Sequence, residues 1–97
     1  MVTVGVLAQF EVKPGSEEEM ADFFREGLPL VEAQPRTTVW FAFRRSDTTY
    51  GAFAAFANDQ DRDALLSSGG PQLSKNYAHL FATAPSFEKV DVLEARL

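Results

Sequence analysis

The sequence predicts a single α+β domain that spans residues 1–97 in the order strand, helix, strand, strand, helix, strand. Three observations predict this order. Apolar residues alternate at the start of the chain, two segments carry helix-type apolar spacing, and an aromatic hairpin lies between those segments. This is the split β-α-β, or ferredoxin-like, arrangement, in which both helical segments cover one face of a four-stranded antiparallel sheet.

The first strand and helix are predicted from patterns at opposite periods. Apolar residues fall on even positions over residues 2–12, which is the alternation of a strand. After a Lys-Pro-Gly turn, Ser16 and Glu19 have the spacing of a capping box at the start of a helix. Because Pro29 lacks a backbone donor and crowds the preceding turn, we expect that helix to kink or end near Leu28.

The central hairpin is predicted from its aromatic residues and its polar loop. Strands are expected at about 37–44 and 49–57, joined by the loop 45–48. We expect Arg44 to pair with Thr49 across this loop. In a strand, a shift of one residue in this pairing would move every side chain to the other face of the sheet.

The second half of the chain predicts two short helices and a final strand. Residues 58–59 supply a cap for a helix that ends at about Leu66, and Ser-Ser-Gly-Gly at 67–70 breaks it. A further helix is expected over 71–84, with Pro71 suited to its first position. The last strand is expected over 87–97, with a bulge or burial on both faces because its apolar parity switches.

Both faces of the predicted sheet are apolar. Phe41 and Phe43 alternate with Trp40 in one central strand, and Tyr50 alternates with Phe53 in the next. Soluble monomers rarely expose large apolar patches, so something must cover the face that the helices leave open. We expect a second copy of the chain to cover it in a two-fold homodimer.

Composition excludes several classes of function. Fourteen Asp and Glu against nine Lys and Arg give a net charge of −5, which opposes nucleic-acid binding. The chain has no Cys and one His, so we expect neither a metal site nor a cysteine nucleophile. The first apolar stretch is too short for a membrane span. We therefore expect a cytoplasmic protein without a membrane or nucleic-acid partner.

The element order and several short motifs resemble the antibiotic biosynthesis monooxygenase domain of the dimeric α+β barrel superfamily. The motifs are KPGSEEE at 13–19, the aromatic hairpin, FAND at 56–59 and EKVDVL at 88–93. The resemblance implies a homodimer whose sheets close into a barrel, with a pocket in each subunit between sheet and helices. Characterised members oxidise aromatic quinols with molecular oxygen and no cofactor, degrade haem, or act on small signalling molecules.

Three positions depart from the family pattern. Phe56 stands where members often have Trp, Leu65 where many have His, and Ala8 where haem-degrading relatives have Asn. Haem degradation is therefore disfavoured, because no axial nitrogen stands at these positions. Quinol oxidation without a cofactor is not excluded, since such chemistry relies partly on the reactivity of the substrate itself while the pocket orients and desolvates it.

The candidate catalytic residues lie in the expected helix 71–84. His79 is the only side chain with an unperturbed pKa near neutral pH and could deprotonate a quinol. Asn76 could donate to a quinone oxygen, and Tyr77 points inward with a hydroxyl that needs a partner. Each also has a structural interpretation, as a surface histidine, a helix-face amide and a buried core tyrosine.

Aromatic side chains are expected to wall the pocket, with small residues such as Ala8 and Ala52 leaving room for a flat apolar ligand. The substrate-binding residues expected from this argument are Phe24, Phe41, Tyr50 and Phe56. In the geometry that the resemblance implies, the expected hairpin pairing places Phe41 on the pocket side and Trp40 in the dimer core.

The sequence thus predicts a monooxygenase-like protein that acts on a small quinol-type aromatic compound and needs no cofactor. Two alternatives remain open, because a fold does not determine a function. One is a non-catalytic dimer that binds a small hydrophobic metabolite. The other is an enzyme of another type on the same scaffold, such as an isomerase or a lyase.

Overall fold

The structure, a computed structural model, describes residues 1–68 and 70–97. Its strands and helices, in chain order, are β1 (Val4–Glu11), α1 (Glu17–Glu32), β2 (Val39–Arg44), β3 (Thr49–Phe56), α2 (Asp59–Leu66), α3 (Gly70–Asn76), the short 3₁₀ helix η1 (Ala78–Leu80) and β4 (Ser86–Asp91). None of the helices in the described part of the chain is both long enough and apolar enough to cross a membrane.

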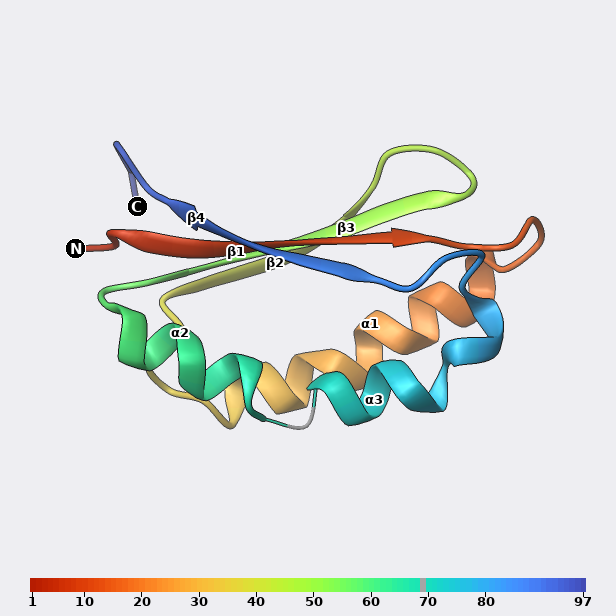
Figure 1. Ribbon diagram of the computed structural model, residues 1–97, viewed down its shortest axis with the longest axis horizontal. Coiled ribbons are helices and arrows are strands. Elements are labelled where there is room, and N and C mark those ends of the chain that lie inside the picture. Colours follow the sequence, from red (N-terminus) through yellow and green to blue (C-terminus); the bar gives the residue numbers. More distant parts are fainter. Residues whose placement is uncertain (69) are drawn as a thin grey trace.

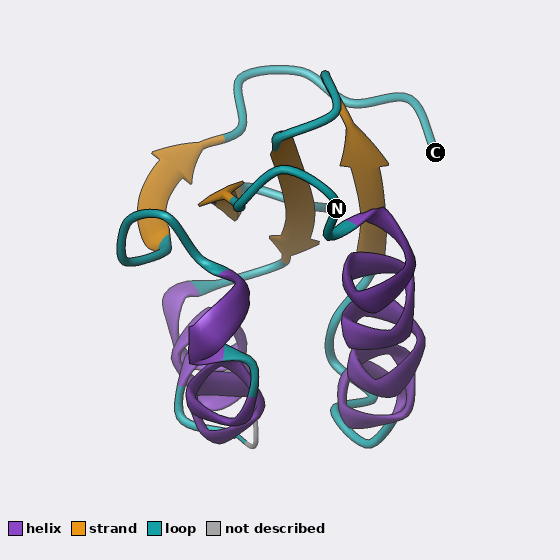
Figure 2. Ribbon diagram, turned by 90° about the vertical axis from the view of Figure 1, so that its right-hand side faces the viewer, coloured by secondary structure: helices purple, strands orange, loops and turns teal. Residues whose placement is uncertain are grey.

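The sheet and the helices form two layers. The strands pair antiparallel in the order β2-β3-β1-β4, and α1, α2 and α3 all lie beneath one face of this sheet (Figure 1). Seen end-on, α1 runs on one side of the helical layer and α2 with α3 on the other (Figure 2). The predicted ferredoxin-like fold is therefore confirmed. We call the sheet face toward the helices the inner face and the opposite one the outer face.

The start and end of α1 differ from the prediction. Ser16 is the N-cap, but it has φ −100° and ψ 12° and its side chain makes no capping hydrogen bond, so the expected capping box with Glu19 is wrong. The helix also continues through Pro29 to Glu32. Pro29 lies on the exposed side, and its carbonyl accepts from the amide of Ala33 at 3.0 Å, so the helical hydrogen bonding resumes after the proline.

The hairpin pairs one residue away from the predicted position. Arg44 lies opposite Tyr50, not Thr49. The Ser46 hydroxyl accepts from the amide of Thr49 at 3.1 Å, and the carbonyl of Thr49 accepts from the amide of Arg45 at 2.8 Å. This bonding holds Thr49 inside the turn and makes the loop one residue longer than expected.

The shifted pairing exchanges the faces of the β2 side chains. Trp40 lies opposite Ala54 on the inner face, and Phe41 lies opposite Phe53 on the outer face. The ring of Phe43 lies over Gly51, where a Cβ would come within 2.5 Å of it. The aromatic rings of the outer face thus contact a glycine or each other, while the indole of Trp40 faces the helices opposite the small Ala54. The expected placements of Phe41 in the pocket and Trp40 in a dimer core are wrong.

The short helix α2 follows the prediction. The Asn58 side chain caps it by accepting from the amide of Asp61 at 2.9 Å, and the helix ends at Leu66. Of the predicted break at 67–70, Gly69 lies outside the described residues.

The predicted helix over 71–84 is wrong, because α3 ends at Asn76. The chain then passes through η1, and Phe81 forms a β-bridge with Val12 beyond the end of β1. The amide of Lys13 donates to the carbonyl of Leu80 at 2.8 Å, and the amide of Ala82 donates to that of Glu11 at 2.8 Å. These backbone bonds take the place of a longer helix.

The last strand is shorter than expected. Pairing between β1 and β4 runs from Gln9–Ser86 to Val4–Asp91, and one further bond joins the amide of Val92 to the carbonyl of Thr3 at 2.9 Å. Residues 93–97 are not part of a strand, so the parity switch marks the end of β4 and not a bulge.

Candidate functional site

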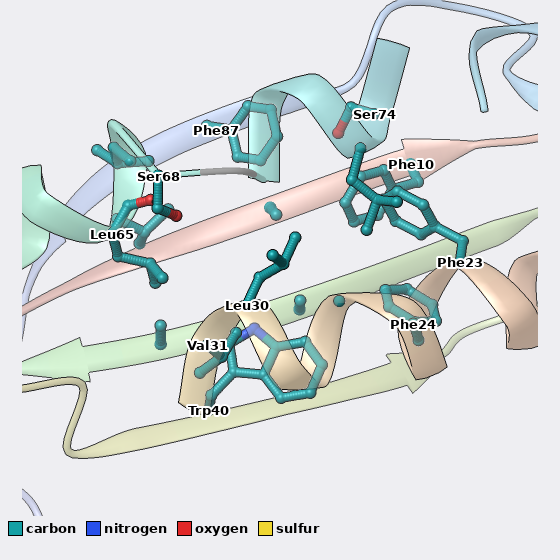
Figure 3. Close-up of a pocket in the computed structure, with 17 residues that line it drawn as sticks. Phe10, Phe23, Phe24, Leu30, Val31, Trp40, Leu65, Ser68, Ser74 and Phe87 are labelled. Atoms are coloured by element: carbon teal, nitrogen blue, oxygen red, sulfur yellow. The ribbon is translucent and has the colours of Figure 1, made fainter. Parts of the chain in front are cut away.

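A cavity of about 320 Å³ lies between the inner face of the sheet and the helices. The sheet and the helices both contribute to its lining (Figure 3). The lining residues from the sheet are Val6, Ala8, Phe10, Trp40, Ala52, Ala54 and Phe87. Those from the helices and their connection are Phe23, Phe24, Gly27, Leu30, Val31, Leu65, Leu66, Ser68, Leu73 and Ser74.

The cavity is open because alanines form its floor. Ala8 lies opposite Ala52, and Ala52 lies opposite Ala42, so three strands in succession present a methyl group to the helices. Ala54, two residues further along β3 on the same face, also lines the cavity. Side chains this short do not reach the helical layer, and the expected role of Ala8, Ala52 and Ala54 in leaving room is confirmed.

Aromatic rings close one end of the cavity. Phe10 packs edge-on against Phe23 and Phe24, with ring centroids 5.3 and 5.7 Å away (Figure 3). Phe87, on the edge strand β4, packs edge-on against Phe10 at 6.2 Å and remains 48% exposed. The cavity is therefore bounded by packed rings at this end, with Phe87 between its interior and solvent.

The lining is almost wholly apolar. Among the described residues that line the cavity, the polar side-chain groups are the hydroxyls of Ser68 and Ser74 and the indole N–H of Trp40. The Ser68 hydroxyl already donates to the carbonyl of Leu65 at 2.6 Å. None of these lining residues is titratable, so the wall itself supplies no proton acceptor and no charge. Burying an unpaired charge there would be costly, which favours an uncharged ligand.

The expected substrate-binding residues take four different positions. Phe24 lines the cavity. Phe56 is fully buried but lies outside the lining, and Phe41 is 50% exposed on the outer face. Tyr50 is 6% exposed and stands behind the cavity wall, where its hydroxyl has no hydrogen-bond partner among the described residues.

The three candidate catalytic residues lie close together at the end of α3 and in the turn that follows, outside the cavity lining. Asn76 is exposed and its side-chain oxygen accepts from Gln72 at 3.3 Å. His79 is exposed, and its Nε2 lies 3.2 Å from a carboxylate oxygen of Glu19. This arrangement gives His79 a carboxylate partner at the surface instead of a place beside a ligand.

Tyr77 contacts the core side of α1. Its ring packs edge-on against Phe23 at 5.3 Å and stacks with the ring of His79 at 6.4 Å. Partial burial raises the pKa of the Tyr77 phenol, and the Glu26 carboxylate raises it further. Tyr77 is thus separated from the cavity by Phe23, which lines it.

The prediction from sequence missed Trp40 as a lining residue, although Trp40 is the largest side chain at the site. Like Leu30 and Val31 of α1, it lines the cavity (Figure 3). The available signal was Ser46, whose position in the loop favours a turn closed by a hydroxyl and so the longer loop. No group of three His, Cys, Asp or Glu side chains within the described residues is placed to hold a metal ion.

No protein-family model matches the sequence, and no curated protein matches it. Solved structures do match. The NE2512 protein from Nitrosomonas europaea, of unknown function, is 39% identical with a TM-score of 0.91, and the match covers 100% of this chain and 95% of that one. A putative antibiotic biosynthesis monooxygenase from Caulobacter crescentus is 21% identical with a TM-score of 0.81, covering 96% and 92%.

A mutant of SnoaB, a cofactor-independent oxygenase from Streptomyces nogalater, is 17% identical with a TM-score of 0.79, and the match covers 96% of this chain and 95% of that one. At such identities the last two matches show the fold alone. It is the fold of the domain that the sequence motifs resemble. The chain therefore belongs to the same family as the NE2512 protein, and its fold is that of the antibiotic biosynthesis monooxygenases.

Proposed function

We propose that the chain binds a small, flat, uncharged aromatic compound in this cavity and oxidises it with molecular oxygen, without a cofactor. The observation that carries the proposal is the apolar cavity of about 320 Å³. Ligand pockets usually measure ~300–1,000 Å³ and have a mainly apolar lining, so this one suits a compact ring system. The fold shared with SnoaB, a cofactor-independent oxygenase, supports the reaction type.

With a quinol as substrate the reaction balances without any further reductant. One oxygen atom of O₂ converts a ring C–H bond into C–OH while the quinol is oxidised, which gives a hydroxyquinone. The other oxygen atom leaves as water together with two hydrogens from the substrate. The cavity contributes by orienting the ring and excluding water, because its lining offers no acid or base.

A second candidate, a non-catalytic module that binds a hydrophobic metabolite, is favoured by a specific observation. None of the described lining residues is titratable, and Asn76, Tyr77 and His79 lie outside the lining. If the substrate does not ionise by itself, the cavity binds it without activating it.

The same titration tests both candidates. Trp40 lines the cavity and is the only Trp, so quenching of its fluorescence reports binding. We expect a quinol panel to quench Trp40 and to support oxygen uptake above a heat-inactivated control. Quenching without uptake would contradict the oxygenase. It would support the binding module if the compound is recovered unchanged, and an isomerase or a lyase if it is recovered as an isomer or a cleavage product.

A pair of variants shows whether uptake occurs in the cavity. Ala52→Leu fills space above the floor, whereas Ala64→Leu adds the same atoms to an exposed site on α2. We expect Ala52→Leu to abolish both quenching and uptake and Ala64→Leu to change neither. Uptake that survives Ala52→Leu would place the reaction elsewhere.

We further propose that a second copy of the chain packs on the outer face. The larger apolar side chains of this face form what we call the outer aromatic face, and they are Leu7, Val39, Phe41, Phe43, Phe53 and Val90. Phe41 packs between Phe43 and Phe53, with ring centroids 6.3 and 5.8 Å away, and stays 50% exposed. Covering such rings with the same rings of a twin chain removes apolar surface from water on both subunits.

A further inference from the structure

We propose that the hydroxyl of Tyr50 is the hydrogen-bond donor that recognises a carbonyl or hydroxyl oxygen of the bound aromatic compound, which reaches it by displacing the ring of Phe24. This inference rests on the proposed function, since it requires an aromatic ligand in the cavity. It adds a specificity-determining residue and a requirement on the ligand, namely an oxygen substituent at one end of an otherwise apolar ring system.

The first observation is that this hydroxyl is buried and unpaired. Tyr50 is 6% exposed, and no described residue accepts or donates a hydrogen bond at its hydroxyl. A buried hydroxyl without a partner raises the free energy of the folded protein, so such a group calls for an explanation. A ligand oxygen that pairs with it would remove this cost on binding.

The second observation is where this hydroxyl-bearing ring lies. Its cross-strand neighbour on β1 is Phe10, and the residue two places along β3 on the same face is Ala52. The ring of Phe24 on α1 lies 6.3 Å from the ring of Tyr50, centroid to centroid. All three of these neighbours line the cavity, so Tyr50 stands one layer behind its wall.

The third observation is that one of these neighbours is suited to move. Phe10 is almost fully buried and Ala52 is part of the floor, whereas Phe24 is only half buried. Phe24 belongs to a helix and contacts its aromatic neighbours through tilted or edge-on rings, and these contacts carry no hydrogen bond. An aromatic ligand in its place would restore the same ring contacts and bring its oxygen to Tyr50.

The other buried unpaired atoms do not offer the same opportunity. They are the hydroxyl oxygen of Thr37 and the Nε of Arg62, and neither residue lines the cavity. The remaining guanidinium nitrogens of Arg62 already donate to the carbonyls of Gly5 and Val90 at 3.2 and 3.3 Å and to Asp59 at 2.9 Å. Arg62 therefore fastens α2 to β1 and β4, and among the described residues Tyr50 alone combines an orphaned donor with a neighbouring cavity.

The test compares two probes of nearly the same shape, naphthalene and 1,4-naphthoquinone, by quenching of Trp40. The chain has no Cys for the quinone to alkylate. We expect Tyr50→Phe to weaken naphthoquinone binding roughly tenfold, the effect of losing one hydrogen bond, and to leave naphthalene binding within about twofold. Removing the orphaned hydroxyl should leave the melting temperature of the free protein unchanged or raise it.

A second variant keeps the proposal testable if Tyr50→Phe folds poorly. Phe24→Leu shortens the displaced ring, so it should strengthen the binding of naphthoquinone, which displaces that ring to reach Tyr50, and leave naphthalene binding within about twofold. Thr37→Val removes a buried unpaired hydroxyl that lies outside the cavity lining and serves as the matched control, with both probes expected to bind as before.

Several results would overturn the inference. If Tyr50→Phe weakens both probes equally, Tyr50 acts through packing, and if it weakens neither, the hydroxyl does not contact the ligand. A lower melting temperature of the free variant would mean that the hydroxyl is satisfied without a ligand. If neither probe quenches Trp40 in the unaltered chain, the proposed function fails and this inference fails with it.

Discussion

The two faces of the sheet contain small residues for opposite purposes. On the inner face Ala8, Ala52 and Ala54 leave a cavity beneath the helices. On the outer face Gly5 and Gly51 lie beneath aromatic rings. A Cβ on Gly5 would come within 3.0 Å of the ring of Phe53, and a Cβ on Gly51 within 3.0 Å of the ring of Phe43. A small residue therefore makes space only where no neighbouring side chain can lean over it. On the outer face the rings lean, and on the inner face the helices hold the walls apart.

The largest effect should follow from placing a charge on the outer aromatic face. Phe41→Lys should weaken the proposed dimer by roughly 100-fold or more, since a central aromatic residue carries much of an interface's binding energy. Light scattering at micromolar concentration should then give the mass of one chain. Phe87→Lys is the matched control, because Phe87 is 48% exposed and Phe41 50%, but Phe87 lies on the inner face at the cavity. A monomeric unaltered chain, or a dimer that survives Phe41→Lys, would contradict the proposed dimer.

The next effect tests whether the glycines of the outer face are required. A Cβ at Gly5 would lie 2.9 Å from the carbonyl oxygen of Ala54 and 2.9 Å from the ring of Phe53. Because the first of these is backbone inside the sheet, we expect Gly5→Ala to lower the free energy of unfolding by about 3 kcal/mol in a urea titration.

Gly27→Ala is the control for this substitution. A Cβ at Gly27 would meet only Leu73, at an ordinary 3.8 Å, and alanine favours a helix over glycine. We expect this variant to gain roughly 0.5–1 kcal/mol. Equal stability of the two variants would show that the rings and the sheet adjust freely to an added methyl group.

Adjacent alanines on β3 allow the two faces to be compared directly. Ala54 lines the cavity, and Ala55 is 2% exposed on the outer face. Ala55→Leu should overpack its site and cost about 2 kcal/mol in the free energy of unfolding. Ala54→Leu should cost under about 1 kcal/mol, since it fills open space, but it should abolish quenching of Trp40 by naphthalene. The reverse order of stabilities would mean that the cavity is not open in solution.

The sequence was sufficient for the order of elements and for the alanine floor, since alternation at residues 2–12 and the small residues of β3 are local patterns. It was insufficient for the hairpin faces, because the pairing of Arg44 depends on one hydroxyl, that of Ser46, holding a longer turn. The end of α3 was missed for a different reason. Helical spacing continues past Asn76, but backbone bonds to the end of β1 outweigh it, and such contacts have no local pattern.

The residues of the candidate site show the same contrast between local sequence patterns and long-range pairing. Phe24 was found as a lining residue because it lies on the apolar side of a long helix, where spacing alone determines the face. Phe41 and Trp40 were exchanged by the one-residue shift. The orientations of Asn76 and His79 were predicted for a helix over 71–84, but the helix ends at Asn76. These four errors therefore followed from pairing and from element ends, not from the choice of residue types.

The smallest effect concerns Tyr77, which packs against Phe23 of α1 on the helical side of the sheet. The outer aromatic face contains no tyrosine. The pKa of the Tyr77 phenol is raised by partial burial and by Glu26, so the folded chain keeps this proton at a pH where the unfolded chain has lost it. The stability from this group is therefore fully present below the ordinary tyrosine pKa of about 10 and is lost as the pH rises above it. Urea titrations at pH 8 and at about pH 10.5 should show a smaller loss for Tyr77→Phe than for the unaltered chain. An equal loss in both would mean that the phenol is as well solvated in the folded chain as in the unfolded one, and that Phe23 and α1 do not shield it.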